Sequence, residues 1–147
     1  MASLFRATAL AEQIHANNHA KVIRSLGGEA TAEIHVPEVR GTLENLKHAL
    51  EGEVYEIDSM YPDFLGKTQG TDNSTARTLT WALESEKTHA RFFNEAIALL
   101  EAGKANSWIS EARDFYVRQV CGYLTKSTDS GRCWVCSHFC KDFEVIR

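Results

Sequence analysis

Apolar residues recur along this chain at the three- to four-residue spacing of amphipathic helices, in three long stretches. The pattern predicts helices over about residues 4–26, 42–67 and 75–102, with glycines directly after the first and the third as helix-ending signals. Pro62 lies within the second helix and should kink or locally open it, because proline lacks an amide donor and clashes with the preceding turn. The pattern therefore predicts an all-α bundle with three long helices.

The rest of the chain carries weaker patterns. Partial periodicity predicts a short linker helix over residues 105–117, whereas the residues from 118 onward contain many turn formers and little periodicity. The expected organisation is a helical body over residues 1–104, the linker over 105–117 and a small tail over 118–147. A chain of 147 residues is long enough for one domain with such an appendage.

Each predicted helix carries ionisable side chains within its apolar stripe. The three stripes are Phe5, Thr8, Glu12, His15, His19, Val22 and Leu26; Leu43, Leu46, Leu50, Glu53, Ile57, Met60 and Phe64; and Leu79, Ala82, Glu86, His89, Phe93, Ala96 and Leu100. Glu56 follows Glu53 by one turn. An unpaired buried charge is very costly, so these carboxylates must be neutralised by another group.

The ionisable residues of the stripes pair at a spacing that suits metal ligation. They form two Glu-x-x-His pairs and one Glu-x-x-Glu pair: Glu12 and His15, Glu86 and His89, and Glu53 and Glu56. Side chains three residues apart project from the same helix face, so each pair can hold one ion. Mixed oxygen and nitrogen ligands suit iron or manganese, and this set is typical of a carboxylate-bridged dimetal site in a helix bundle.

Some of these features also have simpler interpretations. A single Glu-x-x-His pair on a helix is common without any metal, so it is the combination of three pairs that points to a dimetal site. His19 also lies on the inward stripe, where we interpret it as a polar core side chain or a support for the ligands rather than as a ligand.

The charge and hydropathy of the chain exclude several classes of function. The net charge is −4 and the isoelectric point is about 5.9, so the chain lacks the excess of basic residues that nucleic-acid binding requires. Mean hydropathy is −0.30 and no run of apolar residues is long enough to span a membrane. The first residues lack the basic and apolar regions of a secretory signal, so we expect a cytoplasmic protein.

All the cysteines lie in the tail, at Cys121, Cys133, Cys136 and Cys140. Clustered cysteines in a cytosolic chain indicate metal ligands before they indicate disulfides.

Five segments of the chain resemble rubrerythrins. Residues 5–19 (FRATALAEQIHANNH) resemble the family's second bundle helix, residues 52–62 (GEVYEIDSMYP) its third and residues 86–89 (EKTH) its fourth. Residues 121–123 (CGY) and 133–136 (CWVC) resemble the family's C-terminal rubredoxin-like domain. The resemblance covers nearly the whole chain.

The resemblance implies a ferritin-like helix bundle with a diiron centre that reduces hydrogen peroxide. The positions that match the family's ligands are Glu12, His15, Glu53, Glu56, Glu86 and His89. Glu53 and Glu56 are the candidates for carboxylates that shift between metal-binding modes during catalysis. Tyr61 is expected either to donate a hydrogen bond into the site or to serve as a packed core residue. The implied cofactors are two iron ions, with one further iron or zinc ion in the tail.

Two departures from the family pattern change these expectations. The family's first helix, which supplies one more glutamate, has no counterpart before Met1, so we expect an exposed apolar groove that drives the formation of a homodimer or larger assembly. In the tail, Arg118 stands where a cysteine should precede Cys121 by three residues. Cys140 is the candidate for the fourth ligand, with His138 as its competitor. The alternative is a degenerate tail with free thiols.

Three functions therefore remain open from the sequence. The first is a diiron peroxidase that acts in oxidative-stress defence and takes electrons, through the tail metal, from a donor such as a rubredoxin or an NAD(P)H-dependent reductase. The second is a non-catalytic, iron-binding ferritin-like bundle, which needs the same glutamates and histidines. The third is a gene remnant whose product folds poorly and binds nothing.

Overall fold

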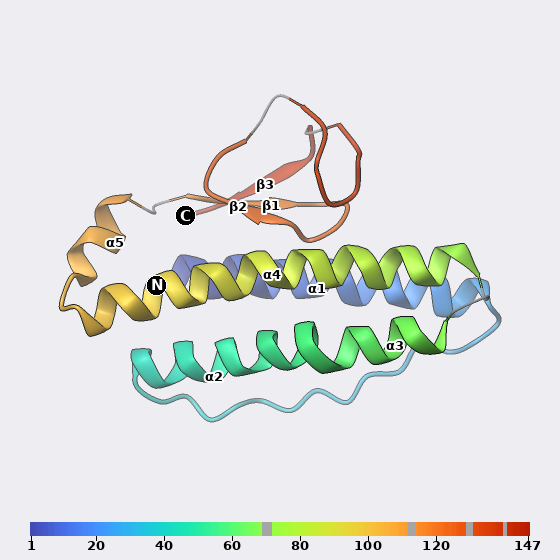
Figure 1. The fold of residues 1–147 in the computed structure, drawn as a ribbon, viewed down its shortest axis with the longest axis horizontal. Coiled ribbons are helices and arrows are strands. Elements are labelled where there is room, and N and C mark those ends of the chain that lie inside the picture. The colour runs from blue at the N-terminus through green and yellow to red at the C-terminus, as the bar shows by residue number, and fades with distance from the viewer. Residues whose placement is uncertain (69–71, 112–113, 129–130, 140) are drawn as a thin grey trace.

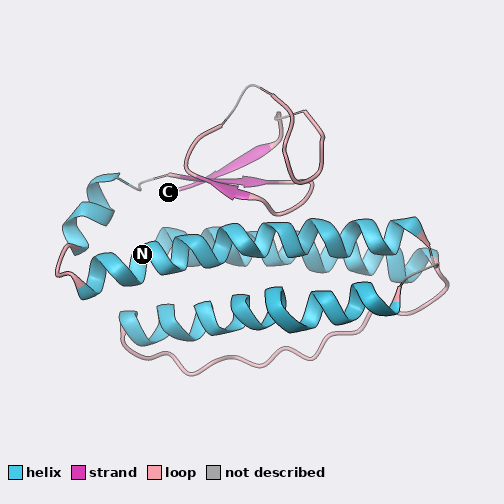
Figure 2. Ribbon diagram, viewed as in Figure 1, coloured by secondary structure: helices cyan, strands magenta, loops and turns pink. Residues whose placement is uncertain are grey.

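The computed structural model describes residues 1–147 except 69–71, 112–113, 129–130 and 140. The predicted helices are present, as α1 (Ala2–Ser25), α2 (Thr42–Tyr55) and α4 (Asn73–Glu101). The second predicted helix continues beyond α2 through a five-residue π-helix, η1 (Glu56–Met60), into α3 (Tyr61–Lys67). The all-α bundle expected from the hydrophobic pattern is thus confirmed (Figures 1 and 2).

The helix α4 occupies the centre of the bundle. It packs against α1 on one side and against α2, η1 and α3 on the other, whereas no Cα atom of α1 comes within 8 Å of one in α2. The connection over residues 26–41 runs back along the bundle, so α1 and α2 point the same way and α4 runs opposite to both (Figure 1). A groove lined by residues of α1, α2 and α4 lies between α1 and α2.

The π-helix lies directly before Pro62, where the sequence predicted a local opening. A proline within a helix removes one amide donor and its ring crowds the preceding turn, and a wider π turn relieves that crowding. The inserted residue also shifts the buried stripe by one position. As a result Tyr61 is only 4% exposed, whereas Phe64, which was expected to face the core, is 41% exposed.

Leu26 is a second correction to the predicted stripes, because it is 63% exposed. It caps the C-terminal end of α1, beyond the last turn of the helix, and its neighbour Gly27 adopts φ +83°. A left-handed glycine redirects the chain away from the bundle, so the final position of the stripe does not reach the core.

The tail forms a small antiparallel sheet that the sequence did not predict. A short helix, α5 (Ala105–Glu111), leads to β1 (Phe115–Arg118), β2 (Leu124–Thr125) and β3 (Phe143–Ile146), in the order β2-β1-β3. The linker helix predicted over 105–117 therefore ends at Glu111, and residues 115–117 lie in a strand. The first three residues of β1, Phe115, Tyr116 and Val117, are aromatic or β-branched, and such residues favour strands.

The tail sheet and the helix bundle share one hydrophobic core. The strand β1 packs against α1, and β2 against both α1 and α4, so the sheet lies over these two helices (Figure 1). Phe115 meets Phe92 of α4 edge to face at 5.3 Å between ring centroids, and Trp108 packs beside Phe115. Within the described residues, no helix has the length and apolar character needed to cross a membrane.

Candidate metal centre

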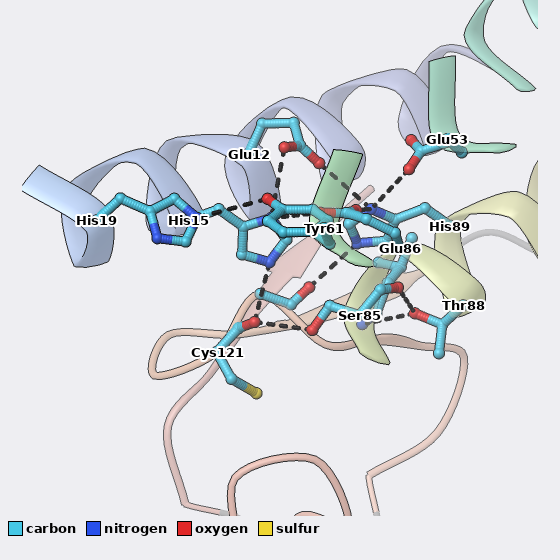
Figure 3. A network of polar contacts seen from close by, with 12 residues as sticks. Glu12, His15, His19, Glu53, Tyr61, Ser85, Glu86, Thr88, His89 and Cys121 are labelled. Carbon is cyan, nitrogen blue, oxygen red and sulfur yellow. Dashed lines mark hydrogen bonds and ion pairs between the residues drawn. The ribbon is translucent and has the colours of Figure 1, made fainter. Parts of the chain in front are cut away.

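Three helices bring four ionisable side chains together at mid-bundle. Glu12 of α1, Glu53 of α2, and Glu86 and His89 of α4 each offer one ligand atom, and these four atoms all lie within 4.8 Å of one another. All four residues belong to the apolar stripes identified in the sequence, because the 3.6-residue helical period turns these positions towards the bundle axis. Figure 3 shows them converging from the three helices.

The Glu86 carboxylate lies between two imidazoles. One of its oxygens is 2.9 Å from His15 Nδ1, and the other is 2.7 Å from His89 Nδ1. Its side chain is completely buried, and the two rings stack at a centroid distance of 5.8 Å. A carboxylate that offers one oxygen to each of two imidazole-bearing sites has the arrangement of a ligand that bridges two ions.

Glu12 and Glu53 complete the surroundings of the two imidazoles. His89 Nδ1 lies 3.3 Å from an oxygen of Glu12 and 3.6 Å from an oxygen of Glu53, and His15 Nδ1 lies 3.4 Å from the other oxygen of Glu12. His89 Nδ1 therefore has three carboxylates around it, counting Glu86, although a single nitrogen can carry only one proton.

The other ring nitrogens determine which atoms face the cluster. His15 Nε2 donates to the backbone carbonyl of Cys121 at 3.0 Å, and His89 Nε2 donates to that of Gly122 at 3.2 Å. A carbonyl oxygen can only accept, so each Nε2 carries a proton and a neutral ring directs the lone pair of Nδ1 at the carboxylates. Lone pairs that face carboxylate oxygens repel unless a proton or a cation lies between them.

The buried polar atoms of the cluster are those that a metal would satisfy. Among the described residues, five buried cluster atoms have no hydrogen bond of acceptable geometry: Glu12 Oε1, Glu53 Oε2, both oxygens of Glu86, and His89 Nδ1. Buried polar groups without partners are rare in folded proteins and costly. Carboxylate oxygens and imidazole nitrogens suit iron, so the residues present fit the diiron centre expected from the sequence.

Without a metal, the cluster must hold protons instead. Burial lowers the pKa of His15, but the Glu12 and Glu86 carboxylates, which would accept the proton on Nδ1, outweigh burial and raise it to about 10. Burial raises the pKa of Glu53 to about 7. Burial, together with the negative charges of Glu86 and Glu12, raises the pKa of Glu56 to about 8. The metal-free site thus binds extra protons, which divalent cations would displace.

Glu56 lies beside the cluster rather than within it. It lines a groove of about 300 Å³ between α1 and α2, together with Glu12 and Glu53. The other lining residues are Phe5, Thr8, Ala9, Ala49, Gly52 and Phe93. Glu56 is also the first residue of the π-helix. The groove connects the carboxylates to the surface, and Glu56 lies in its wall one turn after Glu53.

Tyr61 and His19 lie next to the ligands without joining them. The Tyr61 hydroxyl is 3.4 Å from His19 Nε2, and His19 Nδ1 is 3.2 Å from Thr78 Oγ1. Burial raises the pKa of Tyr61 and lowers the pKa of His19, so both side chains are neutral near pH 7. The structure therefore gives His19 a polar supporting position, in agreement with its interpretation from the sequence.

The thiols of the tail form a second cluster. Cys121, Cys133 and Cys136 are buried, and their sulfur atoms lie within 4.8 Å of one another. Cys140, the candidate fourth ligand, is outside the described residues. His138 does not join this thiol cluster: its Nδ1 donates to the Cys136 carbonyl at 2.9 Å, and its ring meets Trp81 edge to face.

Arg118, which stands where the resemblance led us to expect a cysteine, has a structural position in the tail. Its side chain is fully buried and donates to the backbone carbonyl of Phe139. The guanidinium also lies 3.8 Å from Asp142 and over the ring of Phe143 at 5.5 Å. The arginine therefore ties β1 to the segment before β3 and to β3 itself.

Sequence reasoning missed the residues around the two candidate histidine ligands. Ser85 donates to the Cys121 carbonyl at 2.8 Å, and Thr88 donates to the Ser85 carbonyl at 2.8 Å. Gly122 adopts φ +77° beside the His15 ring. The sequence does place two hydroxyl residues, Ser85 and Thr88, near Glu86 on the inward side of α4. Their partners are backbone carbonyls, which cannot be identified from residue types.

Comparison with known proteins gives consistent matches. The family model described as rubrerythrin matches residues 1–97. Rubrerythrin-2 of Clostridium acetobutylicum is 34% identical over 135 residues, which cover 90% of this chain and 71% of that protein. Nigerythrin of Nitratidesulfovibrio vulgaris is 32% identical over 138 residues, which cover 92% of this chain and 65% of that protein. The structure of fully reduced, all-ferrous nigerythrin superposes with a TM-score of 0.81 and 29% identity, covering 98% of this chain and 69% of that one.

Proposed function

Because this chain belongs to the rubrerythrin family and is a diiron protein of the rubrerythrin type, we propose that it reduces hydrogen peroxide at the cluster between α1, α2 and α4. The observation that carries the proposal is the Glu86 carboxylate between His15 Nδ1 and His89 Nδ1. Two imidazoles that share one buried carboxylate suit two ions that act on one small substrate.

The contacts of the candidate ligands with His15 and His89 indicate how the ligands would be shared between two ions. Glu86 would bridge, His15 would bind one ion and His89 the other, and Glu12 faces both imidazoles. Glu53 lies on the His89 side. Glu56, in the wall of the groove, would enter the set when its carboxylate swings inward. When bound, a ferrous pair supplies two electrons, one from each ion, for the conversion of hydrogen peroxide and two protons into two waters.

The protein's own residues would admit and orient the peroxide. The groove between α1 and α2 is the route by which a small neutral molecule reaches the carboxylates, and Phe5 and Phe93 line it. Tyr61 is neutral and buried, so its hydroxyl is available as a hydrogen-bond donor near the cluster. Exclusion of bulk water strengthens each of these electrostatic contacts.

Electron delivery through the tail is the second part of the proposal. Cys121 contributes a thiol to the tail cluster, and its carbonyl accepts from His15 Nε2. The path from that sulfur to a diiron ligand therefore comprises one residue's covalent bonds and one hydrogen bond. This short connection supports electron transfer from a tail metal to the diiron centre, with a rubredoxin or an NAD(P)H-dependent reductase as the external donor.

The experiment is anaerobic single-turnover mixing of the diferrous protein with hydrogen peroxide. We expect oxidation at least about a hundredfold faster than that of free ferrous ion in the same buffer, which corresponds to roughly 2.7 kcal/mol of barrier lowering. Glu86→Gln should abolish the acceleration. Glu84→Gln, on the same helix but paired with Lys87 at the surface, is the matched control and should retain it.

Oxidation of the wild-type protein no faster than free ferrous ion, with two irons bound, would reject the peroxidase. That result would favour the non-catalytic iron-binding bundle, which requires the same ligands but no accelerated reaction.

A further inference from the structure

The two Glu-x-x-His motifs of the bundle differ at the residue that precedes the glutamate. In α1 that residue is Ala11, and in α4 it is Ser85. Both side chains are completely buried. A buried hydroxyl needs a partner, and a serine within a helix often finds one in a carbonyl of the preceding turn. Ser85 instead donates to the backbone carbonyl of Cys121 in the tail, at 2.8 Å.

The Cys121 carbonyl accepts a second hydrogen bond at the same oxygen. His15 Nε2 donates to it at 3.0 Å, so a hydroxyl of α4 and an imidazole of α1 meet at one atom (Figure 3). The Gly122 carbonyl accepts from His89 Nε2 at 3.2 Å. Among the described residues it has no second donor, so only one of the two candidate histidine ligands shares its carbonyl partner.

Two donors on one carbonyl oxygen weaken each other. The oxygen has two lone pairs and can accept both hydrogen bonds, but each donor withdraws electron density from it. The acceptor at the outer nitrogen of a metal-binding imidazole raises the basicity of the ring, and a weaker acceptor raises it less. Ser85 therefore lowers the electron density that His15 Nδ1 offers to the carboxylate cluster, although it acts from the far side of the ring.

Thr88, three residues further along α4, has a similar position without this effect. Its hydroxyl is also buried, donates to the Ser85 carbonyl at 2.8 Å and accepts from the Leu124 amide at 3.4 Å. Thr88 thus helps to hold the tail on α4 but makes no hydrogen bond to the Cys121 carbonyl. The two hydroxyls separate a role in packing from a role at that carbonyl.

We propose that Ser85 is a positioning residue that tunes one half of the diiron centre through the Cys121 carbonyl. The inference rests on the diiron site of the proposed function, but not on its reaction with peroxide. A less basic imidazole stabilises the higher charge of a ferric ion less. The hydroxyl therefore raises the reduction potential of the ion held by His15, at which one ferric ion gains one electron, and does not affect the ion held by His89.

Potentiometric titration of the iron-loaded protein tests this effect. The electron paramagnetic resonance signal of the mixed-valent pair separates the two one-electron steps. Ser85→Ala should lower the potential of one step only, by about three- to tenfold in its equilibrium constant, since one hydrogen bond is removed; tenfold corresponds to about 59 mV. Ser85→Thr keeps the hydroxyl and should retain both potentials.

Thr88→Val is the matched control for the titration. It removes a buried hydroxyl from the same face of α4 but leaves the Cys121 carbonyl with both of its donors. We expect both reduction potentials to stay at their wild-type values in this variant.

A measurement without redox chemistry tests the hydrogen bond itself. In the zinc-loaded protein with nitrogen-15-labelled histidine, each Nε2–H proton resonance reports the strength of the bond that its imidazole donates. Ser85→Ala should move the His15 resonance downfield, because the Cys121 carbonyl loses a competing donor, and should leave the His89 resonance in place. Thr88→Val should move neither resonance.

Unchanged potentials in Ser85→Ala would overturn the inference and show that the hydroxyl only anchors the tail to α4. Equal shifts in Ser85→Ala and Thr88→Val would also overturn it, because they would indicate a general loosening of the tail. Neither measurement uses peroxide. A protein that shows the Ser85 effect but oxidises no faster than free ferrous ion would therefore reject the peroxidase and retain the inference.

Discussion

Gly122 and His15 pack so closely that a Cβ atom on residue 122 would lie 2.2 Å from His15 Nε2. The residue also has φ +77°, a conformation that favours glycine. The turn after Cys121 can therefore approach the candidate ligand His15 only because residue 122 has no side chain. Cys121 thus links the two clusters: its thiol belongs to the tail cluster, and its carbonyl and that of Gly122 accept hydrogen bonds from His15 and His89.

Gly122→Ala should consequently weaken the fold and separate the tail from the bundle. Left-handed strain and the clash with His15 together should lower the free energy of unfolding by about 1–3 kcal/mol, as measured by urea denaturation. Gly66→Ala is the control, because a Cβ atom at this position of α3 would have no heavy atom within 4 Å and alanine favours helix. Equal stability of Gly122→Ala and wild type would contradict the close approach.

Metal content should depend on the buried carboxylates and not on their exposed neighbours. Glu53→Ala and Glu86→Ala each remove atoms that face the imidazoles, so bound iron measured after gel filtration should fall from two per chain at the bundle towards one or none. Glu51→Ala and Glu84→Ala change the surfaces of the same helices and should keep the wild-type iron content. Unchanged iron in both buried variants would refute the ligand assignment.

The metal-free protein should lose stability as the pH rises. The folded-state pKa values of Glu53, about 7, and Glu56, about 8, lie above the unfolded value of 4.5, so folding favours their protonated forms and their contribution is lost between about pH 4.5 and 8. The raised pKa of His15, about 10, adds stability that is complete below about pH 6.5 and is lost as the pH rises towards 10.

Denaturation of the chelated protein across pH 5.5 to 9 measures this dependence. Glu56→Gln should flatten the fall between pH 5.5 and 8, whereas Glu51→Gln, at an exposed position of α2, should leave the profile unchanged. Iron-loaded protein should show a much weaker fall, because bound cations take the place of the protons. Stability that increases with pH in the metal-free protein would refute the explanation.

Arg118→Cys should have opposite effects on the tail's fold and on its metal affinity. Loss of the buried guanidinium leaves the Phe139 carbonyl without its donor, which should lower the stability of the metal-free protein by about 1–3 kcal/mol. The new thiol restores the paired Cys-x-x-Cys spacing and should tighten cobalt binding, followed by thiolate charge-transfer absorption. Arg118→Lys, which keeps a cation but not the fork of donors, should lose stability without any gain in cobalt affinity.

The sequence predicted the features that depend on helical period. Stripe positions located Glu12, Glu53 and Glu86 correctly on facing helices, because one period governs each helix over its whole length. The stripe prediction failed where the helical period changes, because the π-helix before Pro62 leaves Phe64, which was expected in the core, 41% exposed.

Features that depend on contacts between residues distant in the sequence could not be predicted from the sequence. Residues 115–117 of β1 were predicted as helix, because their burial comes from packing on α1 and Phe92, which lie far away along the chain. The partners of the histidine Nε2 atoms are backbone carbonyls more than thirty residues away along the chain. Arg118 was judged only as a missing ligand, since its contacts with Phe139 and Phe143 depend on how the tail folds.

Self-association was expected from the sequence and remains a prediction. The groove between α1 and α2 bears small residues at Ala9, Ala49 and Gly52, and the acidic cluster forms part of its wall. The connection after α1 adds Ile34, Val36 and Val39, which are 84%, 90% and 85% exposed. Burial of these side chains in an interface would supply about 25 cal/mol per Å² of apolar surface.

We therefore expect a homodimer or larger assembly by light scattering at micromolar concentration. Ile34→Glu with Val36→Lys should shift the protein towards monomer without affecting the folding of a chain, because neither side chain belongs to its core. Val54→Lys changes an exposed apolar residue of α2 that does not line the groove and should leave the assembly intact. A monodisperse wild-type monomer would show that these exposed residues serve another purpose, and the diiron cluster would then have to function with the ligands of a single chain.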